Sequence, residues 1–221
     1  EIAALTRARG AWLHVDGAFG LWARISPALA PLAKGIEKAD SIATDGHKWL
    51  NVPYDCGIVF CAHPEAHRAA LSLAAAYIVS DARERDPHEF VPEESRRARA
   101  VPVYVALRTL GRDGLRDLVE RNCAQARRMA ERLAAHPAVR ILNEVVLNQV
   151  LVRFDTGRGD ADGLTRAVIA GVQKEGTCWL GGTTWHGLDA VRISTSNWST
   201  TDQDIDLSAE AILRVLETMR S

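Results

Sequence analysis

Apolar residues follow two contrasting patterns along the chain. Residues 11–19 and 40–48 are short apolar segments that each end in a glycine-bearing turn, a pattern typical of buried strands. The stretch from Leu21 to Lys38 between them is long enough for a crossover joining two parallel strands. Residues 111–135 instead repeat apolar side chains at steps of three and four, which predicts an amphipathic helix. Its apolar positions are Leu115, Leu118, Val119, Cys123, Ala126, Met129, Ala130 and Leu133.

The remaining segments predict further alternation of helices and strands. Glycine, proline and polar clusters punctuate them, which favours short connections between elements. Residues 80–99 are densely charged and contain two prolines, so we expect an exposed, mobile loop there. The expected helices are 1–10 (ending at Gly10), 64–79, 164–174 and 202–219 (with Thr200 or Thr201 as N-cap), and the expected strands are 56–61, 139–142, 145–154, 177–180 and 190–194.

Bulk composition narrows the function classes. The chain has 221 residues, 47% hydrophobic and 25% charged, which is ordinary for a globular protein of one or two domains. A net charge of −1 argues against nucleic acid or an anionic membrane as a partner. No apolar run approaches the length of a membrane span. The four cysteines lack metal-type spacing, so we expect no metal site and reduced thiols in a cytoplasmic enzyme.

An acid and a lysine stand just after the first two predicted strands. They lie in His14-Val15-Asp16-Gly17-Ala18 and in Asp45-Gly46-His47-Lys48-Trp49. In open α/β sheets, ligands bind at the carboxyl ends of strands. Pyridoxal phosphate (PLP) chemistry needs a lysine amine for the cofactor aldehyde and an acid beside the pyridine nitrogen. Taken singly, each residue has an ordinary alternative: a surface lysine, and an aspartate that ends a strand.

These motifs carry a family resemblance. Together with Trp49-Leu50, Asp55-Cys56 and Ser95-Arg96-Arg97-Ala98-Arg99, they resemble the C-terminal half of group II PLP-dependent amino acid decarboxylases. That group includes the aromatic amino acid, histidine and glutamate decarboxylases, and the aromatic branch is the most similar. The resemblance implies an α/β fold of fold type I. Residues 1–105 would be the remainder of the large, mostly parallel-sheet PLP-binding domain, and residues 106–221 a small C-terminal α/β domain.

The resemblance also implies that a long N-terminal half precedes this segment in the complete protein. That half would supply the cradle for the cofactor phosphate and a ring stacked on the pyridine. The chain opens within a predicted helix and without a methionine. We therefore interpret it as a fragment, a processed product or one chain of a split protein, and the missing half is a predicted partner.

The resemblance assigns roles to individual residues. Lys48 would carry the cofactor, Asp16 would pair with the pyridine nitrogen, and Ala18 would leave room against one face of the ring. His47 would lie near the phosphate or the point of attachment; alternatively, it is a histidine bonded to a backbone carbonyl. Asp45 stands where the aromatic branch has asparagine, and we expect it to bond backbone amides of its turn.

Tyr77 is the second catalytic candidate. Counted from Lys48, it falls where the aromatic branch has a tyrosine that returns a proton after CO2 leaves. The alternative is a tyrosine at a helix end. Arg96, Arg97 and Arg99 would make interdomain or dimer contacts, or else form a solvated basic face.

The predicted function is decarboxylation of an L-amino acid, with aromatic ones as candidates, to the amine and CO2. The alternatives are a lyase, an aminotransferase or an aldehyde synthase on the same fold, or an inactive fragment that lacks half of the site. The expected partners are a small amino acid substrate and a second copy in a homodimer, with neither nucleic acid nor membrane.

Overall fold

The computed structural model describes residues 1–72, 86–157 and 159–220. The chain divides at Gly111 into two compact units, residues 1–111 and 112–221. Gly111 interrupts helix α3 (Ala100–Ala134) with φ 61° and ψ −173°, a conformation that only glycine adopts readily. The predicted PLP-binding and small domains, with a boundary near residue 105, stay a prediction. Within the described residues, no helix combines the length and apolar character needed to cross a membrane.

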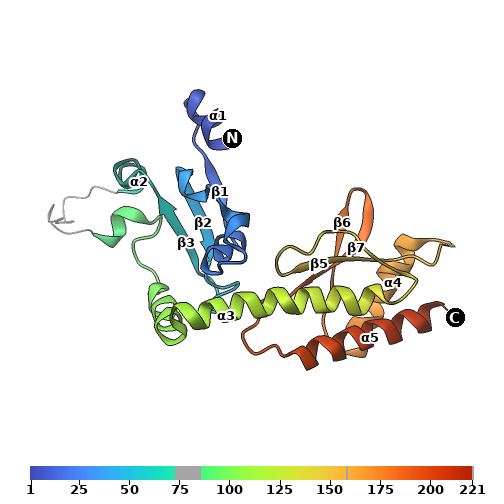
Figure 1. Ribbon diagram of the computed structural model, residues 1–221. Helices are drawn as coiled ribbons and strands as arrows, with labels where there is room; N and C mark the ends of the chain where they lie inside the picture. The colour runs from blue at the N-terminus through green and yellow to red at the C-terminus, as the bar shows by residue number, and fades with distance from the viewer. Residues whose placement is uncertain (73–85, 158, 221) are drawn as a thin grey trace. The chain divides into compact units, whose positions relative to one another are not determined.

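The first unit contains a three-stranded sheet in the order β1-β2-β3 (Figure 1). β1 and β2 are parallel, as predicted, and β3 returns antiparallel to β2. The predicted crossover is built from three short 3-10 segments rather than an α-helix. The elements are α1 (Ile2–Ala8), β1 (His14–Asp16), 3-10 segments Gly20–Ile25, Ala30–Ala33 and Ile36–Lys38, β2 (Ser41–Asp45), β3 (Gly57–Cys61), α2 (Pro64–Leu71) and 3-10 segment Pro87–Phe90.

One expectation for this unit is wrong. β1 is not a buried strand: Val15 is half-buried, and His14 and Asp16 are exposed. The reason is that β1 pairs with β2, and no described strand covers its other edge. The exposed loop expected over residues 80–99 is confirmed for residues 92–98, whereas Glu89 is buried and pairs with Arg68 at 2.6 Å.

The core of the first unit lies beside the lysine turn, residues 46–50. Trp49 is fully buried, and its ring meets the ring of Phe19 edge-on, with centroids 5.6 Å apart. The buried apolar side chains of this unit are Ala23, Ala39, Trp49, Leu50, Val52 and Cys56.

The second unit contains a four-stranded antiparallel sheet in the order β4-β5-β7-β6. Helix α4 packs against β5 and β7, and α5 packs against α4. Figure 1 shows α3 and α5 running alongside each other in this unit. Its elements, besides the second part of α3, are β4 (Val139–Ile141), β5 (Gln149–Phe154), α4 (Ala161–Glu175), β6 (Gly181–Trp185), β7 (Leu188–Ser194) and α5 (Asp202–Arg220).

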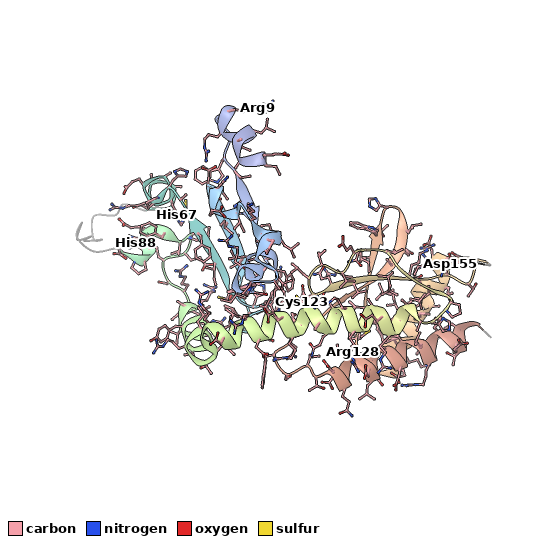
Figure 2. The ribbon with its side chains drawn as sticks, viewed as in Figure 1. Arg9, His67, His88, Cys123, Arg128 and Asp155 are labelled. Atoms are coloured by element: carbon pink, nitrogen blue, oxygen red, sulfur yellow. The ribbon has the colours of Figure 1, made fainter. Side chains whose placement is uncertain are left out.

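The amphipathic pattern of the long helix is confirmed. Every apolar position predicted for residues 111–135 is buried in α3. Cys123 is among them, and burial raises the pKa of its thiol to about 11 (Figure 2). The same face also buries Asn122 and Gln125, which the pattern did not reveal; the amide groups of both side chains donate to carbonyls of the loop after β7.

The predicted strand 177–180 is wrong, because β6 begins at Gly181 instead. β6 and β7 form a hairpin closed by His186 and Gly187, with φ of 49° and 79°. Two successive residues with positive φ make the tight turn whose twist matches the strands. The predicted N-cap at Thr201 is confirmed, since its hydroxyl accepts the Asp204 N–H and the Asp204 carboxylate accepts the Thr201 N–H.

Candidate active site

The parallel pairing of β1 with β2 brings the predicted acid and the predicted lysine to the same end of the sheet. Asp16 is the last residue of β1 and lies opposite Ala43. β2 continues to Asp45 and then enters the turn that holds Lys48. Because parallel strands have their carboxyl ends on the same side, both residues lie at the carboxyl end of the sheet.

The turn after Asp16 is fastened to β2. The Gly17 N–H donates to the Ala43 carbonyl at 2.7 Å, and the Thr44 hydroxyl donates to the Ala18 carbonyl at 3.5 Å. The Asp16 carboxylate accepts the Ala18 N–H at 3.0 Å and remains exposed. The acid is therefore held at the sheet edge and still accessible to a ligand. Thr44, which is buried, is a supporting residue that the sequence pattern did not indicate.

The amine of Lys48 reaches the segment that follows Asp16. Its Nζ atom lies 5.3 Å from the centroid of the Phe19 ring, within the range of a cation–π contact. The buried ring of Trp49 packs against the same phenylalanine. The aromatic pair thus connects the lysine turn to the turn after β1.

The expectation for Asp45 is wrong. We expected its carboxylate to bond amides of its own turn, whereas Oδ2 lies 2.7 Å from Lys48 Nζ and 4.0 Å from His47 Nε2. A carboxylate three residues before the lysine can reach the ammonium directly, and an ion pair is a stronger contact than a bond to a neutral amide. Asp45 is therefore the charge partner of Lys48 in this structure.

His47 is held by the loop that precedes β3. Its Nδ1 atom lies 3.1 Å from the Cys56 amide nitrogen and 3.0 Å from the Cys56 carbonyl oxygen. Its ring stacks on Tyr54 at 4.2 Å between centroids. The role of His47 toward a cofactor phosphate stays a prediction.

The arginine cluster contacts this same loop. Arg99 forms two hydrogen bonds to the Asp55 carboxylate, each 2.9 Å long, and Arg97 donates to the Tyr54 carbonyl. The hydrogen bonds from Arg99 lower the pKa of Asp55 to about 2. Arg97 and Arg99 bind partners within the first unit, and the interdomain or dimer contacts expected of these arginines, or else a solvated basic face, stay a prediction. Their hydrogen bonds join the Asp55-Cys56 motif to the Ser95-Arg96-Arg97-Ala98-Arg99 motif, which lie about forty residues apart in the sequence.

The second catalytic candidate, Tyr77, lies outside the described residues, so its position relative to Lys48 is a prediction only. Among the residues that the structure does describe, no three histidine, cysteine, aspartate or glutamate side chains are grouped as metal ligands would be.

Comparison with known proteins places the chain in a family. The model of the pyridoxal-dependent decarboxylase conserved domain matches residues 1–155. The L-2,4-diaminobutyrate decarboxylase of Rhizobium meliloti (strain 1021) is 30% identical over 227 residues, which cover 99% of this chain and 46% of that protein. The 4-hydroxyphenylacetaldehyde synthase of Rhodiola rosea is 26% identical over 209 residues, covering 93% and 43%.

Solved structures show the same fold. The crystal structure of Oryza sativa TDC with PLP and tryptamine matches with a TM-score of 0.92 and 22% identity, over 100% of this chain and 47% of that one. The chain therefore spans under half the length of these relatives. Because the family model covers most of the sequence, the chain belongs to the pyridoxal-dependent decarboxylase family.

Proposed function

We propose that the complete protein is a PLP-dependent enzyme that decarboxylates an L-amino acid to the amine and CO2. The observation that carries this proposal is the arrangement at the carboxyl edge of the first sheet. Asp16 is the last residue of β1. The Nζ atom of Lys48 lies 5.3 Å from the ring centroid of Phe19, which follows Asp16 by three residues. Family membership and the named decarboxylases among the relatives support the same reaction.

The residues present fit PLP. Asp16 offers an exposed carboxylate, which suits a protonated pyridine nitrogen. Lys48 is partly exposed, with about a third of its side chain accessible, so an aldehyde can approach its amine. Ala18 would leave space for the ring, and His47 stands next to the attachment point. Bound PLP would supply an electron sink for the pair released when the carboxyl group leaves.

The residues of this chain would then have separate roles in the reaction. Asp16 would hold a proton on the ring nitrogen through a charge-assisted hydrogen bond. Asp45 Oδ2 holds the ammonium of Lys48 before the cofactor arrives, and it is the nearest carboxylate able to accept a proton released from Nζ. We assign Tyr77 the return of a proton to the substrate carbon, as the resemblance implies.

For the substrate we propose an L-amino acid, and the aromatic ones are the first to test. One relative is named tyrosine decarboxylase, from Oryza sativa subsp. japonica, and it is 36% identical over 56% of this chain. We further propose a homodimer in the cytoplasm, completed by an N-terminal half, as the resemblance implies. The four cysteines are free thiols, which fits a reducing compartment.

Labelling of the lysine tests the proposal. The complete protein is incubated with PLP, reduced with borohydride and digested, and the modified peptide is identified by mass spectrometry. We expect the label on Lys48, its loss in Lys48→Ala, and no change in Lys38→Ala, a lysine of the same unit. Asp16→Asn should retain the label but lower turnover by about 10²–10³-fold, because the ring loses its charged partner.

The products separate the possible outcomes. Amine and CO2 in equal amounts are expected from the wild-type protein. A label on another lysine would overturn the site, whereas aldehyde, ammonia and peroxide formed with O2 as main products would keep the site and replace amine formation with aldehyde synthesis.

A further inference from the structure

The loop before β3 is held by a segment that follows it by more than forty residues. Arg99 grips the Asp55 carboxylate with Nε and one terminal nitrogen, and its other terminal nitrogen bonds Glu93 at 3.1 Å. Arg97 adds a bond to the Tyr54 carbonyl and lies 3.7 Å from the Asp55 carboxylate. Two parallel N–H···O bonds to one carboxylate require the planar fork of arginine, which fixes the geometry as well as the charge.

The same loop fixes the ring of His47 from two directions. Tyr54 stacks on one face of the imidazole, with the planes 29° apart. The Cys56 amide approaches Nδ1 at 3.1 Å. The Cys56 carbonyl lies 3.0 Å from Nδ1 and accepts the Gly46 N–H at 2.9 Å, so it keeps a hydrogen-bond partner when Nδ1 carries no proton. Since Cys56 is buried, its amide needs an acceptor, and Nδ1 provides one.

The arginine contacts contribute little to the free energy of unfolding, so their role is a local one. Asp55 is 72% exposed, and solvent-exposed ion pairs add little to global stability. The contacts nevertheless join residues 93–99 to the loop 54–56, more than forty residues earlier, and that loop also bonds His47. Their main effect is therefore local order rather than stability of the whole unit.

We propose that Arg99, assisted by Arg97, is a positioning residue of the active site. The two arginines hold Tyr54, Asp55 and Cys56 in place. This loop in turn holds His47 with Nδ1 as hydrogen-bond acceptor and the ring proton on Nε2. The Nε2–H then points toward the side of the ring where Asp45 and Lys48 lie. The orientation itself does not depend on the proposed function; only its use in binding PLP beside Lys48 rests on that function.

The tautomer of His47 tests the proposal without cofactor or activity. In the full 221-residue chain at about pH 8, above the titration range of free imidazole, nitrogen-15 correlation spectra distinguish the two ring nitrogens. We expect separate signals for an unprotonated Nδ1 and a protonated Nε2. Arg99→Gln should collapse this separation as the ring exchanges between tautomers, and Asp55→Asn should do the same. Arg96→Gln, which changes the neighbouring arginine, should leave the spectrum as in the wild type.

Two results would each overturn the proposal. A locked Nδ1 acceptor in both Arg99→Gln and Asp55→Asn would overturn the proposal, and so would a wild-type His47 with its proton on Nδ1. If Arg99→Gln does not fold, Arg99→Lys keeps the positive charge without the fork and should still loosen the tautomer. A PLP label that misses Lys48 would overturn the proposed function and leave the positioning role intact, because the nitrogen spectra do not depend on the cofactor.

Discussion

The two units of this chain differ in how they combine chemistry with stability. The first unit holds Asp16, Lys48 and the contacts of Arg97 and Arg99 with the loop before β3, yet it buries few apolar side chains. The second unit holds none of the predicted site residues, and its contiguous core joins three helices to β4, β5 and β7. Reactive groups must stay accessible, whereas a stable core must exclude water, so the two needs are met in separate parts of the sequence.

Core truncation should show the largest difference between the units. Phe154 in β5 is 1% exposed within the core of the second unit, whereas Phe60 in β3 is 53% exposed. We expect Phe154→Ala to lower the free energy of unfolding by about 3–5 kcal/mol, from lost burial and the cavity that remains. Phe60→Ala should cost under about 1 kcal/mol. Urea unfolding of both variants measures this, and equal losses would mean that the core is shared more evenly.

Adding a methyl group to a packed helix of the second unit should also destabilise it, but by less than truncating its core. A Cβ at Gly171 in α4 would lie 2.6 Å from a Val215 methyl group and 3.0 Å from the Met219 methyl group. Val215 is branched and stiff, so we expect Gly171→Ala to destabilise by about 1–3 kcal/mol despite the better helix propensity of alanine. Gly20→Ala, in the first unit, meets nothing within 4 Å and serves as the control. A stabilised Gly171→Ala would show that α4 and α5 pack loosely.

We expect a fall in pH to lower the free energy of unfolding of both units, each by a small amount. Hydrogen bonds from Arg128 (Figure 2), together with the neighbouring Arg132, lower the pKa of Asp206 to about 2, and Arg99 does the same for Asp55. A lowered pKa in the folded state stabilises the fold above the ordinary carboxyl value of 3.8, and this contribution is lost as the pH falls toward 2. Asp206→Asn should therefore flatten the pH dependence of unfolding of the second unit in that window. Asp55→Asn should leave that dependence unchanged.

Local patterns predicted much of this molecule, for a physical reason. The long helix was identified position by position because a single helix face recurs at a fixed spacing. Asp16 and Lys48 were found because the first ends a strand and the second lies in the turn after one, and the separation of those strands predicted their parallel pairing. Such signals lie within a few residues of one another, so a single sequence contains them.

Contacts that depend on distant partners were missed. The burial of Glu89 requires Arg68, and the burial of Gln125 requires the carbonyl of Thr200. Neither pairing leaves a periodic trace. The β6 strand was misplaced because its Gly-Gly-Thr-Thr start lacks apolar alternation, although the His186-Gly187 turn after it was a usable hairpin signal.

The burial of Trp49 has an optical consequence. This indole is fully enclosed and directly follows Lys48, whereas Trp12, Trp179 and Trp198 are each more than half exposed. Emission from an enclosed indole is shifted to shorter wavelengths than emission from solvated ones. A chromophore bound to Lys48 would quench the blue part of the intrinsic fluorescence first, so the chain contains its own unlabelled reporter of what occupies the lysine.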